Sequence, residues 1–162
     1  MSKIKVQISN RQKSVKIPNG IAILLRRCCN AVLEMEQITD NAEVNIIFVD
    51  DKQIHEINLE HRKIDNPTDV LSFPLGENGS FPINPENNYI MLGDIVISVE
   101  RAVKQSVEFD HPLTRELGYL TTHSMLHLLG YDHVNGGMEQ VRMREKEELV
   151  MEAVGQSRDK AL

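Results

Sequence analysis

The sequence predicts an α/β (α+β) fold in one domain, with a small mixed four-stranded sheet packed against about five or six helices. Two observations support this prediction. Strand patterns over residues 3–8 and 43–49 are separated by a helical pattern, and strand and helix patterns continue to alternate beyond them. The chain has 162 residues and contains no repeat, low-complexity tract or linker, so we expect residues 1–162 to form a single domain.

The first part of the chain predicts a strand, a helix, a strand and a second helix. Polar and apolar side chains alternate over residues 3–8, which is typical of a half-buried strand. An apolar stripe with helical spacing then begins at Ile21. The next strand is predicted over residues 43–49, and either Asp50 or Asp51 is placed to cap the short helix that follows.

The second part of the chain completes the sheet and adds further helices. Prolines border the apolar run at residues 70–73, which indicates a short strand between turns. Turn-forming residues dominate residues 76–88, which we expect to form a surface loop, and residues 91–98 have the apolar character of a central strand. Three more helices are predicted over residues 99–108, 112–129 and 138–153.

The composition excludes several classes of protein. Hydrophobic residues make up 41% and aromatic residues 4%, which indicates a globular chain with an aliphatic core. There is no apolar run near the roughly 18 residues of a membrane span and no apolar signal-peptide core, so we expect a cytoplasmic protein. The net charge of −6 argues against coating nucleic acid by bulk attraction, but it allows a locally basic cleft. The adjacent Cys28 and Cys29 lack the spacing of a metal or redox site.

A histidine cluster is the clearest functional signal. The stretch HSMLHLLGYDH contains three of the six histidines of the chain. On a helix, His123 and His127 are one turn apart and face the same way. Gly130 suits the left-handed conformation that ends a helix, and the turn that follows can return His133 as a third ligand.

Three histidines predict a catalytic metal site. They leave the fourth tetrahedral position of zinc open for water, and zinc lowers the pKa of that water to about 7. We therefore expect one Zn²⁺ per chain, or another divalent ion in its place, and hydrolytic chemistry. His55, His61 and His111 lack this spacing, and we expect them to be surface or turn residues.

The same spacing also occurs in metzincin peptidases, whose motif is HExxHxxGxxH. The glutamate of that motif is the general base of peptide hydrolysis, and Ser124 occupies its position here. Because serine cannot act as a carboxylate base, a metzincin-like zinc metallopeptidase is the alternative hypothesis rather than the first.

Three stretches of the chain together resemble the YbeY family of single-strand-specific metalloendoribonucleases. The histidine stretch matches the family signature H-G-x-L-H-L-x-G-Y-D-H, with Ser124 in place of glycine. NLEHRKIDNPTDVLSFP, residues 58–74, is similar to N-x-x-Y-R-x-x-D-x-P-T-D-V-L-S-F-P, with His61 at the tyrosine position. LGDIVIS, residues 92–98, is the third stretch, and the three occur in the order of the family.

The resemblance implies a set of site residues. The metal ligands would be His123, His127 and His133, and Arg62 would be the catalytic arginine. Phosphodiester hydrolysis builds negative charge on the non-bridging oxygens, and a guanidinium can pair with two of them. Candidates for substrate contacts or for support of the histidines, with turn capping as the simpler explanation of several, are Asp132, Asp69, Ser72, Asp94 and Lys63. Asp132 is also a candidate general base, while Arg101 and Lys104 are candidates for a phosphate path.

The resemblance also implies a biological role. The function would be late maturation of the 3′ end of 16S rRNA and ribosome quality control, through hydrolysis of RNA phosphodiester bonds. The partners would be single-stranded RNA, the 16S rRNA precursor, the small ribosomal subunit and its associated proteins, with no membrane. The nucleophile stays open between metal-bound water and a ribose 2′-hydroxyl. A non-catalytic zinc-stabilised ribosome-assembly factor is the second alternative, although it does not explain an open fourth position on the metal.

Overall fold

A computed structural model describes residues 3–131 and 137–156 of the chain. Its elements are β1 (Ile4–Asn10), α1 (Ile21–Met35), β2 (Ala42–Val49), α2 (Asp51–Arg62), β3 (Val70–Pro74), β4 (Ile90–Ser98), α3 (Val99–Glu108), α4 (Leu113–Leu128) and α5 (Met138–Ala153). The sheet has the order β1-β2-β4-β3, in which the first three strands are parallel and β3 runs antiparallel to β4. The predicted α/β class and mixed four-stranded sheet are confirmed, and the strand boundaries differ from prediction by one or two residues.

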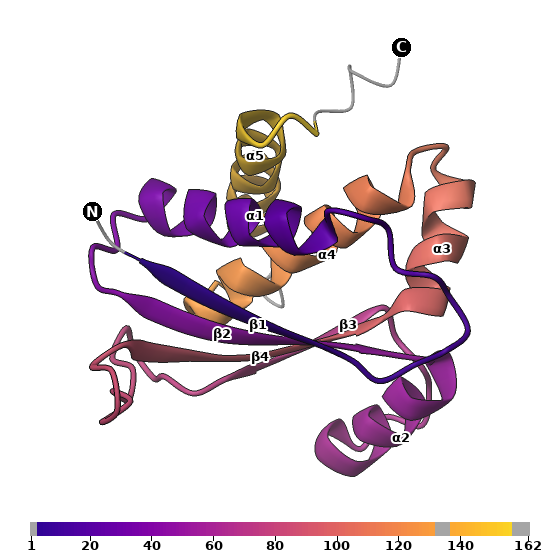
Figure 1. Ribbon diagram of the computed structural model, residues 1–162, viewed down its shortest axis with the longest axis horizontal. Helices are drawn as coiled ribbons and strands as arrows, with labels where there is room; N and C mark the ends of the chain where they lie inside the picture. The colour runs from indigo at the N-terminus through magenta and orange to yellow at the C-terminus, as the bar shows by residue number, and fades with distance from the viewer. Residues whose placement is uncertain (1–2, 132–136, 157–162) are drawn as a thin grey trace.

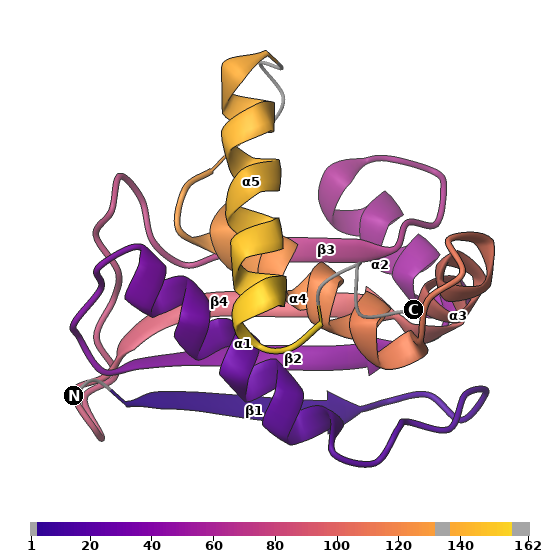
Figure 2. The same cartoon turned by 90° about the horizontal axis from the view of Figure 1, so that it is seen from above.

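The helices cover the two faces of the sheet unequally (Figure 1). The helices α1 and α4 lie on one face, while α2 lies on the other. Seen from above, α5 crosses α4 and its first turns project past the edge formed by β3 (Figure 2). No helix in the described ranges has the length and apolar character needed to cross a membrane.

The main core lies between the sheet and the helices α1 and α4. Leu25, Ile46, Ile95 and Leu126 are all fully buried there. Cys28 belongs to the same core, as its neighbour does, and burial raises the pKa of its thiol to about 11. It therefore behaves as a small apolar side chain, in agreement with the absence of any metal or redox spacing.

The helix α2 is held on the other face of the sheet by a smaller apolar cluster. Ile54 packs there with Leu71 of β3 and with neighbouring side chains of β2 and β4. Asp50 is the cap of α2: its carboxylate accepts a hydrogen bond from the Gln53 backbone at 2.8 Å, and the Gln53 side chain accepts one from the Asp50 backbone at 2.9 Å. This capping box fixes where α2 begins.

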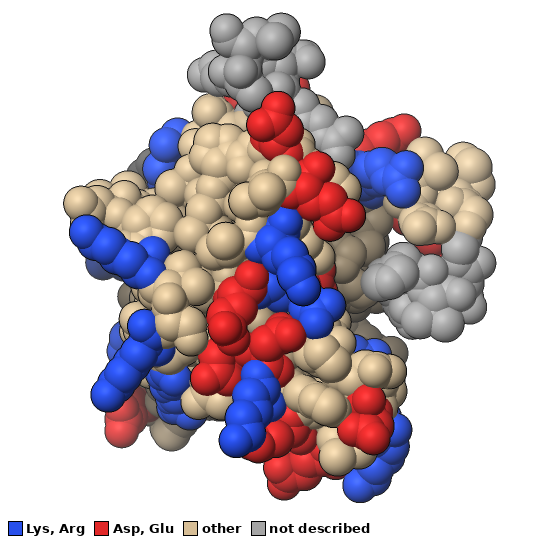
Figure 3. Space-filling model, turned by 90° about the vertical axis from the view of Figure 1, so that its right-hand side faces the viewer, with Lys and Arg blue, Asp and Glu red and all other residues tan. Residues whose placement is uncertain are grey.

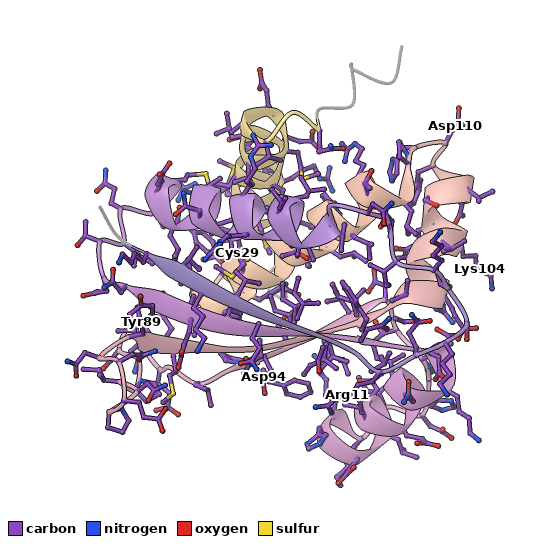
Figure 4. The ribbon with its side chains drawn as sticks, viewed as in Figure 1. Arg11, Cys29, Tyr89, Asp94, Lys104 and Asp110 are labelled. Carbon is purple, nitrogen blue, oxygen red and sulfur yellow. The ribbon has the colours of Figure 1, made fainter. Side chains whose placement is uncertain are left out.

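A bulge in β4 determines which side chains face the helices. Val44 of β2 pairs with Gly93, whereas the preceding residue of β2 pairs with Met91, so Leu92 is the extra residue of β4. Gly93 has φ +140°, and a Cβ atom there would lie 2.2 Å from the carbonyl oxygen of Phe73. After the bulge, alternation resumes and places Asp94 on the face of the sheet that carries α2 (Figure 4).

Candidate active site

A cavity of about 530 Å³ lies at the β3 edge of the sheet. Its lining side chains come from the end of α2, from the segment 68–74 and from the carboxyl-terminal part of α4. They are Arg62, Thr68, Asp69, Val70, Ser72, Pro74, His123, His127, Gly130 and Tyr131. Five residues singled out from the sequence therefore meet around one cavity: Arg62, Asp69, Ser72, His123 and His127.

The two histidines of α4 bring their ring nitrogens close together. Their Nε2 atoms are 3.1 Å apart, on side chains one helical turn apart. Two nitrogens bound to one tetrahedral zinc at 2.0–2.1 Å would be separated by about 3.3 Å. The separation in the structure fits a shared ion. The other predicted ligand, His133, and the candidate base Asp132 lie outside the described residues.

The end of α4 is formed as the sequence predicts. Gly130 has φ +108°, its backbone N–H donates to the carbonyl of His127, and the N–H of Tyr131 donates to the carbonyl of Leu126. This pair of hydrogen bonds is the Schellman arrangement, which ends a helix at a left-handed residue. Tyr131 then lines the cavity, and its hydroxyl donates at 2.5 Å to Glu36, the residue that caps the end of α1. The chain is thus anchored directly before the segment that carries the predicted third ligand.

A buried carboxylate from α5 contacts the first histidine. Glu147, whose side chain is 4% exposed, contacts Nδ1 of His123 with Oε2 and accepts a hydrogen bond from the hydroxyl of Tyr119 at 2.9 Å with Oε1. Burial and the negative charge of Glu147 raise the pKa of Tyr119, so its hydroxyl remains a donor. A carboxylate on one ring nitrogen orients the other toward a metal, which is the usual support of a metal-binding histidine.

Glu147 was not identified from the sequence, although the sequence carries a signal for it. In α5 the buried side chains Met143, Val150 and Met151 form one helical stripe, and Glu147 lies within it. A glutamate at a core position is costly to bury unless it is paired. The position of Glu147 in an apolar stripe therefore predicts a buried partner, but it does not say which one.

Ser124 has a structural partner. Its side chain is fully buried, and its Oγ accepts a hydrogen bond from Oγ of Ser72 at 2.8 Å. The bond ties β3 to α4 between the two histidines. At the position where a metzincin peptidase carries its general base, this chain therefore has a hydroxyl that links two elements, and that hydroxyl does not line the cavity.

Asp69 lines the cavity with a carboxylate that is already engaged. Its Oδ1 accepts hydrogen bonds from the backbone of Val70 at 2.8 Å and from the Thr68 hydroxyl at 3.3 Å, and Oδ2 accepts one from Gln105 at 3.2 Å. These bonds match the turn-capping explanation of Asp69. It is the only carboxylate among the described side chains that line the cavity.

Arg62 is placed by the end of α2. The helix stops after it because Lys63 has the left-handed φ of +60°, and the buried Asn58 donates to the carbonyl of Asn66 at 2.9 Å, which fastens the following loop. Within the described part of the chain, no hydrogen bond or ion pair involves the Arg62 guanidinium. Its donors are therefore available to an anion in the cavity.

Several other predicted residues lie away from the cavity. Asp94 accepts a hydrogen bond from Asn45 at 3.0 Å on the opposite face of the sheet. Lys63 contacts the carbonyl of Glu60, and its side chain is not part of the cavity wall. The phosphate path proposed over α3 is also absent from the cavity wall, since neither Arg101 nor Lys104 lines it.

Arg101 instead joins α3 to α2. It makes hydrogen bonds of 3.1 and 3.0 Å to the two carboxylate oxygens of Asp51, which lowers the pKa of that carboxyl group. Lys104 is exposed on the outside of α3 (Figure 4). This pairing gives Arg101 a structural role that the sequence did not reveal.

The three histidines outside the cluster lie on α2 and in the turn before α4. His55 and His61 are on α2, and His55 pairs with the exposed Asp65 at 2.7 Å. His111 lies in the turn between α3 and α4, within the expectation of a surface or turn residue, and its side chain is 11% exposed and contacts the buried Glu116 at 2.6 Å. Burial raises the pKa of Glu116, and the histidine is the partner that makes the burial tolerable.

Comparison with known proteins agrees with these features. The family model described as Endoribonuclease YbeY matches residues 7–155. An Endoribonuclease YbeY of Thermoanaerobacter sp. (strain X514) is 46% identical over 154 residues, which is 91% of this chain and 96% of that protein. The one of Caldanaerobacter subterraneus subsp. tengcongensis is 46% identical over 157 residues, covering 94% and 98%. A solution structure of a Thermotoga maritima protein has a TM-score of 0.59 and 29% identity, covering 93% of this chain and 89% of that one. The chain therefore belongs to the YbeY family.

Proposed function

We propose that this protein is a metal-dependent endoribonuclease that hydrolyses phosphodiester bonds in single-stranded RNA. The observation that carries the proposal is the meeting of two histidine Nε2 atoms and an arginine, unpaired among the described residues, around one cavity. The names of the relatives, Endoribonuclease YbeY, support the same reaction class.

We propose Zn²⁺ as the cofactor, with one ion per chain and another divalent ion as a substitute. His123, His127 and His133 would hold it. When bound, zinc supplies Lewis-acid chemistry and activates water at neutral pH. The residues present fit such an ion, because Glu147 occupies Nδ1 of His123 and directs Nε2 toward the neighbouring imidazole.

The proposed role of Arg62 is to bind the phosphate under attack. Negative charge grows on the non-bridging oxygens as the bond to phosphorus breaks, and a guanidinium can donate to two of those oxygens together. The histidines and Arg62 approach the cavity from different elements, α4 and α2, so an RNA phosphate can lie between them. Both carboxylate oxygens of Asp69 are hydrogen-bonded, so its proposed role is to support the wall of the cavity and not to bind the phosphate.

In the cell, we propose a role in late maturation of the 3′ end of 16S rRNA and in ribosome quality control, in the cytoplasm. The basis is the resemblance to the family. The small ribosomal subunit and its associated proteins would then deliver the RNA, since the chain has few aromatic residues with which to recognise bases directly.

The test is metal content and cleavage by the purified protein. We expect about one zinc per chain, loss of that zinc in His127→Ala, and cleavage of single-stranded RNA but not of casein. Arg62→Ala should lower kcat by about 10²–10³-fold, as the loss of one donor to a transition-state oxyanion does. Arg11→Ala is the matched control, because Arg11 is an exposed arginine outside the cavity.

The two alternatives predict different results. Casein hydrolysis would indicate a metallopeptidase, and zinc binding without RNA cleavage would indicate a non-catalytic assembly factor. RNA cleavage that survives both chelation and Arg62→Ala would overturn the proposed mechanism and indicate a contaminating nuclease.

A further inference from the structure

We propose that a second, basic depression at the opposite edge of the sheet binds the backbone of single-stranded RNA outside the catalytic cavity. The proposal rests on RNA being the substrate. The depression has a volume of about 520 Å³ and lies where the start of β1 meets the middle of α1. Its lining residues, here called the β1-edge patch, are Lys3, Ile4, Lys5, Arg26, Arg27, Asn30, Asn87 and Tyr89.

The β1-edge patch differs in charge from the face of the molecule seen in Figure 3. The chain has a net charge of −6, and on the face seen in Figure 3 basic and acidic side chains are interspersed. The patch contains two lysines and two arginines, and no carboxylate lines it among the described residues. All four basic side chains are exposed, and none forms an ion pair within residues 3–131 and 137–156. Their charge is therefore available to a polyanion.

Two acidic side chains contact asparagines of the patch and not its basic residues, and one of them is Glu34, which accepts a hydrogen bond from Asn30 at 3.3 Å. Glu43 is the cross-strand partner of Lys5 in the sheet. Its carboxylate accepts hydrogen bonds from Asn84 at 2.8 Å and Asn87 at 3.3 Å instead. The side-chain amides of Asn84 and Asn87, and not Lys5, therefore satisfy the carboxylate oxygens of Glu43. Glu43 itself does not line the depression.

Other groups in the patch suit a nucleic acid better than an acidic protein. Arg26 donates one hydrogen bond to the carbonyl of Ile4 at 3.3 Å, which orients a guanidinium that has five donors. Tyr89 offers a ring on which a base can stack. Cations combined with an aromatic ring are the usual device for holding single strands.

The location of the patch separates it from the reaction. The sheet order places β1 and β3 at opposite edges, about 14 Å apart at the usual strand spacing. Tyr89 and Arg11 lie at opposite ends of the sheet, and Tyr89 is at the end where β1 begins (Figure 4). An RNA that fills the catalytic cavity alone does not reach the patch. Only a longer strand engages both, so the patch should matter for long substrates and not for short ones.

The experiment measures RNA binding without cleavage. The variant is Lys5→Glu/Arg27→Glu, and the matched control is Lys13→Glu/Lys16→Glu, which makes the same charge change at exposed lysines in the segment after β1. The probe is a fluorescent oligouridylate of about 20 nucleotides, longer than the span of one typical single-strand site. Binding is followed by anisotropy in EDTA at several salt concentrations, after confirming that the variants melt like the parent protein.

The expected results are specific. The patch variant should bind at least tenfold more weakly than the control, and the magnitude of its salt slope should fall by about 1.4, since each lost contact to a single strand contributes about 0.7. Tyr89→Ala should weaken binding at least fivefold with the slope unchanged, because stacking releases no counterions. With zinc present, cleavage of an oligonucleotide of about 4 nucleotides should be the same in the patch variant and the control.

Two outcomes would overturn the proposal. In one, the patch variant and the control have equal affinities and equal salt slopes. In the other, polyglutamate of matched charge binds as tightly as the RNA and loses affinity in the same variant, which would assign the patch to an acidic protein. Failure of the proposed nuclease function is separate, since it would appear as absent cleavage while binding in EDTA still depended on the patch.

Discussion

The chemistry of His123 depends on a side chain that comes from another helix. A histidine on the surface of α4 could present either ring nitrogen to a ligand. Glu147 of α5 contacts Nδ1, and the Tyr119 hydroxyl holds the other oxygen of that carboxylate. The ring is therefore fixed in the orientation that brings its Nε2 within 3.1 Å of Nε2 of His127. Packing of α5 on α4 thus orients His123 for its proposed role as a metal ligand.

Replacing Glu147 should weaken metal binding without unfolding the protein. Glu147→Gln keeps the shape and a hydrogen bond but removes the carboxylate charge that contacts His123. We expect zinc affinity to fall about 10–100-fold, measured by competition with a chromogenic chelator. Glu145→Gln is the control, because Glu145 is exposed on the same helix. Equal zinc affinity in the two variants, with equal melting temperatures, would remove Glu147 from the metal site.

At the residue scale, the sequence predicts the chemical groups of the site better than their partners. The spacing of His123 and His127 depends on helix geometry alone, so it could be recognised from the sequence. The contact of Glu147 depends on how two helices pack, and Arg101 pairs with Asp51 because α2 and α3 are neighbours in space. Such contacts are formed by tertiary structure, and no local pattern specifies them.

At the scale of elements, the alternation of side chains predicts the strands but not their order. Each strand was identified by its own apolar pattern, whereas the order β1-β2-β4-β3 follows from how the crossovers pack. This difference explains the position of Asp94. Alternation correctly sets Asp94 opposite Ile95, but only the sheet order and the placement of α4 reveal that the histidines are on the side of Ile95. Asp94 therefore lies away from the histidines.

The close approach of Gly93 in β4 to the backbone of β3 leads to a prediction about stability. A methyl group at this residue would lie 2.2 Å from the carbonyl oxygen of Phe73, and φ is +140°, which side chains other than glycine rarely adopt. Gly93→Ala should therefore destabilise the protein by about 2–4 kcal/mol, combining backbone strain with displacement of β3. Urea unfolding measures this value.

Gly79→Ala provides the control for Gly93. It also has a positive φ, of +79°, but no atom lies within 4 Å of its added methyl group. Its cost should be about 1 kcal/mol, from backbone strain alone. If both substitutions cost the same, close packing of β3 against Gly93 does not contribute to stability.

At the scale of the whole molecule, the candidate active site joins parts of the chain that are far apart in sequence. Arg62 comes from one face of the sheet, the histidines from the other, and the wall between them from the edge strand β3. The Ser72 to Ser124 hydrogen bond and the contact of Tyr131 with Glu36 fasten the same region to β3 and to α1. A ligand that binds at this site should therefore increase the stability of the whole fold.

Zinc should raise the melting temperature of the protein through this connection. A ligand that binds only the folded state stabilises it by about 2.7 kcal/mol at a free concentration 100 times its Kd. For a chain of this length, each kcal/mol corresponds to about 2–4 °C, so the expected increase is about 5–11 °C.

His127→Ala should show no such increase in melting temperature on adding zinc. Without zinc, its melting temperature should be close to that of the parent, because the side chain lies at the cavity wall and not in the core. Arg62→Ala should keep the full increase, since the arginine is proposed to bind phosphate and not the metal. A zinc-dependent shift that survives in His127→Ala would place the ion elsewhere on the protein and contradict the proposed ligand set.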